Sequence, residues 1–450
     1  MKKKMLAVIL TLTMVVSLLG GCGSKNGKED GDKKGTTPTS GAAATEAPKG
    51  DDSQAEQAEP VELTVWGWDA SFNGLALQEA DKLYDGATVN FVEMAKGDCL
   101  QKIHTVLASG VTDDLPDIVI ISDLVAPGYL MSYPGAFYAM DGVLNYDDFA
   151  SYKKAAVSYG GVGYGVPFDT GVAGLFYRTD YIQEAGYTDE DMQNLTWEEY
   201  QVLGQKLKEK GHLLQTYNPN DIAEFQIMLQ SAGTWFTNED GSPNFANNEA
   251  LKECYQIFKN FNESDYVKVV SDWTGFAGAI NGGDVACVIR GSWIASTIKA
   301  AQDQSGLWKV APVPTLSTSG ASNKSNQGGS SWFVLNNSKN AAAAADFLAK
   351  TFGQSTDLYN TLVKEKNIMA TYLPASNVEA YNTEDPFFSG TKINQALASW
   401  IAEIPAVNTG AYSAEAQAAL LAVTPDILAG SDLNASLQKA EEQFSQTIQE

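Results

Sequence analysis

Hydrophobic and polar positions recur with two different periods after residue 60, which predicts strands interleaved with helices. Residues 61–66 alternate apolar and polar side chains as a strand does, and residues 72–84 follow with a helical period. A second strand at 88–93, a second helix at 97–107 and a wholly apolar strand at 118–121 continue the series. This βαβαβ order predicts a mostly parallel sheet with helices on both faces.

Later segments repeat this alternation. The sequence Thr-Trp-Glu-Glu at 196–199 is a capping box and predicts the start of a helix. The other predicted elements are strands at 174–177, 285–289 and 332–335, and helices at 249–261, at 341–351, from 393 onward and at 434–449. The expected fold class is therefore α/β, and roughly 390 residues of patterned chain suffice for two large domains.

The first sixty residues follow a different pattern. Three lysines at positions 2–4 precede an apolar stretch at 6–19, which is too short for a membrane span and typical of a signal peptide. The sequence Leu-Gly-Gly-Cys at 19–22 resembles a bacterial lipobox, which predicts cleavage before Cys22 and a palmitate-type lipid on its thiol. The alternatives are an ordinary secretory signal with a chance cysteine, or an uncleaved anchor helix.

Residues 23–60 contain no aromatic residue and no leucine, isoleucine or valine. Such a segment cannot bury enough apolar surface to offset its ordering entropy, so it is predicted to be a disordered tether. A tether directly after a lipobox is typical of Gram-positive surface lipoproteins. We therefore expect a lipid-anchored protein on the extracellular face of the cell membrane.

Charge and cysteine content exclude several classes of protein. The formal net charge of −25 argues against nucleic acid and anionic lipid headgroups as partners. Beyond Cys22, three cysteines remain, and they can neither all pair nor form a C-x-x-C motif. Cys254 and Cys287 lie among apolar neighbours in a predicted helix and strand, so we expect buried thiols and a fold held by its core.

Motifs for catalysis or cofactors are missing from the sequence. There is no G-x-S-x-G elbow, Walker lysine motif or Rossmann glycine fingerprint, and the two histidines, His104 and His212, are not clustered. We therefore expect no enzyme activity, no metal site and no cofactor.

Aromatic and charged residues recur where the predicted strands end, which is where open α/β sheets bind ligands. Trp68 and Asp69 follow the first strand, Asp123 follows the third, and Arg290 and Trp293 follow the strand at 285–289. A pyranose stacks its apolar face on an aromatic ring, and its hydroxyls bond to Asp, Asn and Arg. Any one tryptophan could equally belong to the core, and either aspartate could cap a helix; the set as a whole predicts a sugar site.

Several blocks, taken in this order, resemble the family 1 extracellular solute-binding proteins of ABC importers, which include maltose-binding proteins. The blocks are VWGWD at 65–69, LPDIV at 115–119, GVPFDTG at 165–171, GLFYRTD at 174–180, TWEEY at 196–200, AINGG at 279–283, GSW at 291–293 and GGSSW at 328–332. The resemblance extends from residue 61 to the C-terminus. It implies a two-lobed α/β fold like that of periplasmic binding proteins, in which each lobe is a mostly parallel sheet flanked by helices and the ligand cleft lies at the hinge. The lobes would close on a sugar or oligosaccharide and present it to a membrane permease.

The resemblance also implies a domain organisation and a monomeric protein. The expected segments are a signal peptide at 1–21, the lipidated cysteine and tether at 22–60, an N-lobe at 61–170 plus 332–370, and a C-lobe at 171–331 plus 371–450. The chain should cross between the lobes near 169–172, 328–331 and 371–376, and the glycines and small residues at the first two of these crossings suit a hinge.

By the same resemblance, each lobe contributes ligand contacts. The expected contacts are Trp68, Asp69, Asp123 and Asp169 from the first lobe, Trp235, Arg290, Trp293 and Tyr412 from the second, and Trp332 and Tyr372 at the crossings. Maltose-type relatives carry an acidic residue where this chain has Gly171, and the nearest acid here is Asp169. This difference argues against a maltodextrin ligand.

Two other classes of function remain as alternatives. A glycoside hydrolase would also combine carboxylates with tryptophan, but we find no compact carboxylate pair in an eightfold βα pattern. A peptide, polyamine or iron receptor would share the two-lobed fold. A polyamine site would need several converging acids and an iron site would need paired tyrosines, whereas a sugar site predicts aromatic rings on both sides of the cleft.

Overall fold

The computed structural model describes residues 60–110 and 115–448. The predicted signal peptide, Cys22 and the tether lie outside the described residues. Within the described ranges, no helix combines the length and apolar character needed to cross a membrane.

The first sheet has the strand order β2-β1-β3-β13-β6. Its strands are β1 (Val61–Gly67), β2 (Ala87–Glu93), β3 (Ile118–Ser122), β6 (Gly165–Asp169) and β13 (Ser330–Val334). β1 pairs in parallel with β2 and β3, whereas β13 runs antiparallel to both β3 and β6. Every residue of β3 is buried, as expected for a strand covered on both faces.

The second sheet is centred on β7 (Val172–Arg178), which is also buried along its whole length. It pairs with β10 (Cys287–Gly291), β11 (Trp308–Ala311) and β12 (Ser325–Asn326), in each case antiparallel. Two short pairs stand apart, β4 (Ser158–Tyr159) with β5 (Val162–Gly163) and β8 (Thr216–Tyr217) with β9 (Lys268–Val269).

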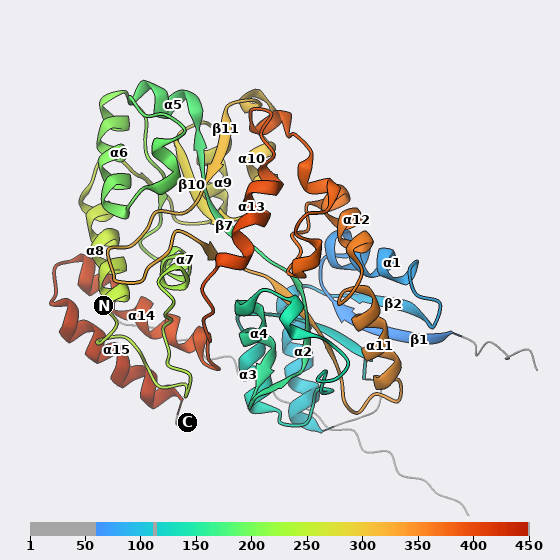
Figure 1. Ribbon diagram of the computed structural model, residues 1–450. Coiled ribbons are helices and arrows are strands. Elements are labelled where there is room, and N and C mark those ends of the chain that lie inside the picture. The colour runs from blue at the N-terminus through green and yellow to red at the C-terminus, as the bar shows by residue number, and fades with distance from the viewer. Residues whose placement is uncertain (1–59, 111–114, 449–450) are drawn as a thin grey trace, which may run out of the picture. The chain divides into compact units, whose positions relative to one another are not determined.

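The helices pack around these two sheets (Figure 1). They are α1 (Leu75–Asp81), α2 (Lys96–Ser109), α3 (Ala126–Ser132), α4 (Ser151–Val157), α5 (Thr179–Glu184), α6 (Trp197–Glu209), α7 (Ala223–Ser231), α8 (Glu249–Glu263), α9 (Trp273–Asn281), α10 (Ile294–Lys299), α11 (Ala341–Thr351), α12 (Thr356–Lys366), α13 (Ile393–Trp400), α14 (Ser413–Leu428) and α15 (Leu433–Thr447). A π-helical turn, η1 (Ala70–Gly74), precedes α1.

Each sheet has its own hydrophobic core. The core of the first sheet includes Val119, Phe168 and Phe347, and the core of the second includes Leu175, Phe225 and Phe258. We call the first sheet with its packed helices the first lobe, and the second sheet with its helices the second lobe. In Figure 1, β1, β2 and α1 lie together in the first lobe, while α5, α6 and β10 lie together in the second.

The prediction that both sheets are mostly parallel is wrong for the second sheet. β7 carries the chain away from the first sheet, and β12 runs back toward β13, so the outgoing and returning strands must run in opposite directions. Alternation of strands and helices indicates an α/β fold, but it does not fix the direction of strands that pair across more than a hundred residues.

Most individual elements were predicted within a few residues. The capping box at the start of α6 is confirmed, because the Thr196 side chain accepts from the Glu199 N–H and the Glu199 carboxylate accepts from the Thr196 N–H. β10 begins and ends two residues later than predicted, so Arg290 lies inside the strand and does not follow it. The predicted helix at 72–84 is divided into η1 and α1.

All three described cysteines are free and buried, as predicted for Cys254 and Cys287. Burial raises the pKa of the Cys99 thiol to about 11 and that of Cys287 to about 12, and it also raises the pKa of Cys254. Protonated, inaccessible thiols react slowly with alkylating reagents. We expect iodoacetamide at pH 8 to modify these three residues only after unfolding in urea, as peptide mass spectrometry would show; rapid modification of the native protein would contradict this.

Candidate functional site

Two adjoining cavities form the candidate site. The first, which we call the inter-lobe cavity, has a volume of about 340 Å³ and lies between elements of both lobes. It is lined by Lys96, Ser122, Asp123, Leu124, Tyr152 and Ala156 from the first lobe, and by Gln226, Gln230, Trp235, Trp293, Asn326, Gln327, Gly328, Val407 and Thr409 from the second lobe and the crossing that leads to β13.

The second cavity, which we call the second-lobe cavity, has a volume of about 460 Å³. Its lining consists of Thr216, Tyr217, Asn218, Asp221, Ala223, Glu224, Phe258, Val270, Asp272, Trp273, Phe276, Arg290, Trp293 and Gln327. Both volumes fall within the range of small-molecule sites, and both linings combine aromatic rings with a few polar groups.

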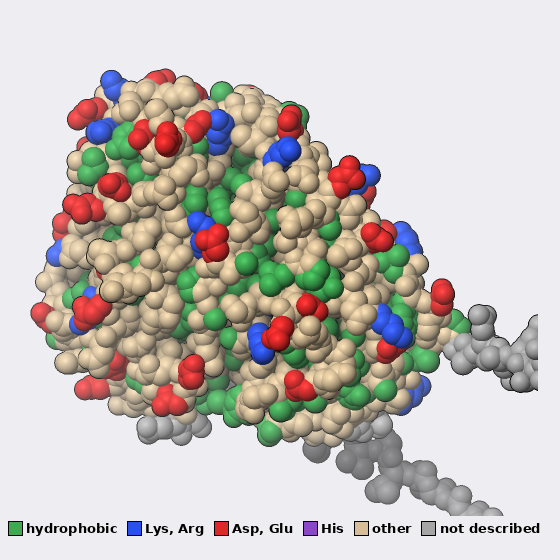
Figure 2. Space-filling model, in the orientation of Figure 1, with side chains coloured by type: hydrophobic (Ala, Val, Ile, Leu, Met, Phe, Trp, Pro, Cys, Tyr) green, Lys and Arg blue, Asp and Glu red, His purple; other side chains and the backbone are tan. Residues whose placement is uncertain are grey.

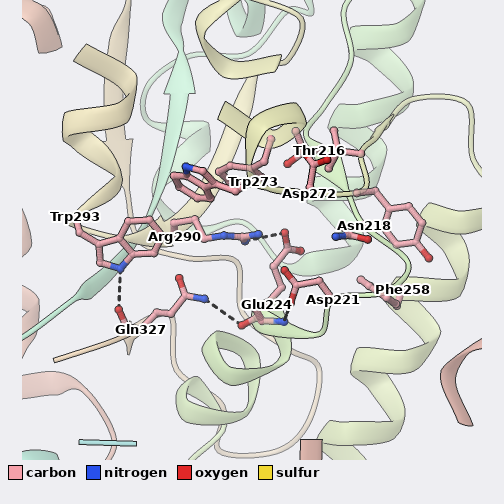
Figure 3. Close-up of a pocket in the computed structure, with 14 residues that line it drawn as sticks. Thr216, Asn218, Asp221, Glu224, Phe258, Asp272, Trp273, Arg290, Trp293 and Gln327 are labelled. Carbon is pink, nitrogen blue, oxygen red and sulfur yellow. Dashed lines mark hydrogen bonds and ion pairs between the residues drawn. The ribbon is translucent and has the colours of Figure 1, made fainter. Parts of the chain in front are cut away.

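Trp293 is the one aromatic residue, among those described, that lines both cavities. Its side chain is 44% exposed, which is unusual for a tryptophan outside a binding surface. The indole N–H donates to the main-chain oxygen of Gln327 at 3.0 Å, so the ring is held in place although it faces solvent. Figure 3 shows this bond and places the Trp293 ring beside that of Trp273.

Trp273 extends the aromatic surface of the second-lobe cavity. It begins α9, is 54% exposed and lies with its ring centroid 6.0 Å from that of Trp293. Phe276, one helical turn later, stacks on it at 5.1 Å. Figure 3 shows Asn218, Asp221 and Glu224 on the side of the cavity opposite these tryptophans. This geometry offers apolar faces for stacking and, across from them, amide and carboxylate groups for hydroxyls.

Arg290 forms an ion pair with Glu224 in the floor of the second-lobe cavity. Their side chains are almost fully buried, the N–O distance is 2.9 Å, and the guanidinium also lies 4.7 Å from the centre of the Phe276 ring. Arg290 is therefore part of a structural ion pair and also lines the cavity.

On the first-lobe side, Asp123 is fixed by two donors. Its Oδ1 accepts from the Ser331 hydroxyl at 2.7 Å, and its Oδ2 pairs with the buried ammonium of Lys153. Lys153 also donates to the main-chain oxygens of Asp169 at 2.8 Å and Ser330 at 2.9 Å. One ammonium thus connects a residue of the cavity wall to the two segments that lead between the sheets.

Asp169 belongs to the same network. It ends β6, and its carboxylate accepts from the main-chain N–H of Ser330 at 2.8 Å and from the Ser330 hydroxyl at 2.5 Å. Desolvation raises the pKa of Asp169, and the Lys153 ammonium and the Ser330 donors offset only part of this effect. Its role in the structure is to hold β6 against β13, and it lines neither cavity.

Gly171 has a steric reason for lacking the acid found in maltose-type relatives. A Cβ atom at this position would lie 2.0 Å from the main-chain oxygen of Gln327, much closer than any real contact. Gly291 is similarly restricted, because its Cβ would lie 2.5 Å from the indole nitrogen of Trp293. Glycine at both positions therefore allows the main chain to pack directly against Trp293 and Gln327.

Of the ten residues predicted to contact ligand, four line the cavities: Asp123, Trp235, Arg290 and Trp293. Trp235 is mostly buried, and its indole N–H donates to the Ser413 hydroxyl at 2.8 Å. Trp68 does not line either cavity, but it contacts a residue that does. The ammonium of Lys96, which lines the inter-lobe cavity, lies 5.4 Å from the centre of the Trp68 ring.

The other predicted residues have structural contacts and do not line either cavity. Asp69 adopts a left-handed conformation at the start of η1 and accepts from the Ser71 hydroxyl. Trp332 does not reach the cleft, because it lies in the central strand β13 and is completely buried between Phe168 and Phe352. Tyr372 packs on Phe149 and Tyr359, and Tyr412 packs on Phe444.

Several residues that line the second-lobe cavity were not predicted from the sequence, chiefly Asn218, Asp221, Glu224, Asp272, Trp273 and Gln327. A search for aromatic residues after strands could not find Trp273, which lies in the first turn of a helix. The polar turn Asn-Pro-Asn-Asp at 218–221 was a usable signal, because such a turn seldom forms without exposing its side chains.

Comparison with known proteins places this chain in a family. A family model described as bacterial extracellular solute-binding protein matches residues 76–385. A lactose-binding protein of Rhizobium radiobacter is 40% identical over 393 residues, which are 86% of this chain and 93% of that protein. The chain therefore belongs to the bacterial extracellular solute-binding proteins, and the resemblance seen in the sequence is confirmed.

Solved structures support the same fold. The ABC transporter-associated binding protein of B. animalis subsp. lactis Bl-04, in complex with β-1,6-galactobiose, matches with a TM-score of 0.64 and 21% identity over 86% of this chain and 97% of that one. The galacto-N-biose/lacto-N-biose I-binding protein of the ABC transporter of Bifidobacterium longum, in complex with lacto-N-biose, matches with a TM-score of 0.68 and 18% identity over 88% and 98%. The two-lobed fold expected from the sequence is confirmed.

Proposed function

We propose that this protein captures a short oligosaccharide with a terminal β-linked galactose and delivers it to the permease of an ABC importer. The observation that carries this proposal is the inter-lobe cavity, which is lined by Trp293 and Trp235 of the second lobe and by Asp123 and Tyr152 of the first. Aromatic faces combined with hydrogen-bonding side chains are the arrangement that a pyranose requires.

The choice of galactose rests on the relatives. Lactose, β-1,6-galactobiose and lacto-N-biose, which appear in the names of the three similar proteins, all carry a β-linked galactose at the non-reducing end. The axial hydroxyl of galactose needs a polar partner on one side of the ring while the other side stacks. Gln226, Gln230 and Asn326 line the cavity and can supply such partners.

Closure of the two lobes is the proposed capture step. The first crossing would be the two residues between β6 and β7, and the second the three between β12 and β13, with lobe boundaries at 61–170 plus 332–370 and at 171–331 plus 371–450. Gly328 and Gly329 have φ angles of 105° and 106°, a backbone region that favours glycine and suits a hinge. A ligand that contacts both lobes stabilises the closed form.

The lipid anchor on Cys22, with the tether that follows it, completes the proposal. It would keep a monomeric protein at the extracellular face of a Gram-positive cell membrane, near its permease. On the face shown in Figure 2, Lys and Arg side chains stand apart from one another among Asp and Glu and form no continuous basic area, in keeping with a small neutral ligand as partner. We further propose that the protein carries out no catalysis.

Thermal unfolding in the presence of sugars tests the function. We expect lactose at about one hundred times its Kd to add about 2.7 kcal/mol to the free energy of unfolding and to raise the Tm, whereas maltose should have little effect. A panel that includes a short peptide and spermidine provides the contrast. A rise in Tm with the peptide or spermidine and none with any sugar would overturn the proposal, and release of galactose from lactose would show an enzyme.

A further inference from the structure

The two cavities of the site have a common wall. Trp293 and Gln327 line both of them, and the bond from the Trp293 indole to the Gln327 main-chain oxygen holds that wall together. Trp293 lines both cavities and is partly exposed, so its ring is available to ligand units bound in either of them.

The cavities differ in which part of the molecule surrounds them. The inter-lobe cavity is bounded by both lobes, so a sugar unit bound there contacts both. Every residue that lines the second-lobe cavity lies between positions 216 and 327, within the segment that the chain forms between β7 and β13. A unit bound there contacts one lobe only and leaves the relative position of the lobes unchanged.

The second-lobe cavity nevertheless has the chemistry of a sugar site. Trp273 presents an exposed indole face backed by Phe276, and Asn218 lies across the cavity from it (Figure 3). The Asp221 carboxylate accepts from the Ala223 N–H and the Asp272 carboxylate from the Gly275 N–H, each through Oδ1. Oδ2 of Asp272 also accepts from the Ser271 hydroxyl at 3.4 Å. Because each carboxylate oxygen has more than one lone pair, both groups keep acceptor capacity for sugar hydroxyls in this cavity.

We infer that the site is bipartite and selects its ligand by chain length: the inter-lobe cavity holds the terminal galactose, and the second-lobe cavity holds the sugar units that follow it. This inference rests on the proposed function, and it adds that the ligand class is linear oligosaccharides of two or more units. The terminal unit drives closure because it contacts both lobes. The following units add affinity through Trp273 without adding to closure.

Isothermal titration of the full chain with galactose, lactose and the trisaccharide β-galactosyl-lactose tests the inference. For the unmodified protein we expect affinity to rise with each added unit. In Trp273→Ala the affinity for lactose and for the trisaccharide should fall about tenfold, while that for galactose should stay within about twofold. Trp273→Phe keeps an aromatic face and should recover most of the loss.

Tyr159→Ala is the matched control, because Tyr159 is an exposed aromatic residue in the first lobe that lines neither of the two cavities. It should leave all three affinities unchanged. Equal losses for galactose and the trisaccharide in Trp273→Ala, or no loss for the trisaccharide, would overturn the inference while sugar binding itself stands. Failure of the unmodified protein to bind any of the three sugars would instead overturn the proposed function.

Discussion

Lys153→Met is expected to lower the free energy of unfolding by about 3–5 kcal/mol, a large effect for one residue. Lys153 is completely buried, and its ammonium is paired with Asp123. Methionine has a similar length but cannot donate, so the Asp123 carboxylate and the main-chain oxygens of Asp169 and Ser330 would lose a charged donor. Urea unfolding followed by circular dichroism would measure the change.

The neighbouring lysine provides the control. Lys154 is about half exposed, and its nearest acid, Asp147, lies 3.7 Å away at the surface. Lys154→Met should therefore change the free energy of unfolding by less than about 1 kcal/mol. The double variant Asp123→Asn with Lys153→Met removes the unpaired charge and should recover part of the stability. Equal effects of the two single lysine variants would show that the buried pair has no special role.

Trp293→Ala should abolish measurable sugar binding, with an expected loss of about 2–4 kcal/mol in binding free energy. No other aromatic residue lines both cavities among the described residues, so its removal takes one aromatic face from each cavity at the same time. The side chain is 44% exposed, and stability should change little. Titration calorimetry with lactose, combined with the Tm of the free protein, would separate the two effects.

Trp293→Phe and Gly291→Ala sharpen this test. Phenylalanine keeps a ring but loses the bond to Gln327, so an intermediate affinity is expected. A methyl group at position 291 would meet the indole nitrogen and displace the ring, which should weaken binding although Trp293 is still present. Unchanged lactose affinity in Trp293→Ala would exclude both cavities as the sugar site.

The secondary structure of this chain could be predicted well because most elements have strong local signals. α11 was expected at the residues where it occurs, since five consecutive alanines lead into an amphipathic turn. The direction of the strands in the second sheet could not be predicted, because it depends on the pairing of β7 with strands more than a hundred residues away. Local patterns carry no information about such pairing.

Only part of the candidate site was predicted, because some of its residues have a local signal in the sequence and others do not. Asp123 and Trp293 were found because they follow strands directly, and strand ends converge at the edge of a sheet. Trp332 was assigned to the cleft because it lies near a crossing, but a strand covered on both faces buries all its side chains. Trp273 and Asn218 lie on a helix and a turn that only tertiary folding brings to the cavity.

The position of β13 affects how the protein can be made. This strand lies between β3 and β6, yet it begins at residue 330 of 450. While the earlier residues leave the ribosome, β3 and β6 have no partner on the side that each will later share with β13, so the first lobe cannot complete its sheet. We therefore expect the first lobe to reach its final fold only after β13 has been synthesised, and a chain released before that point to lack the centre of this sheet.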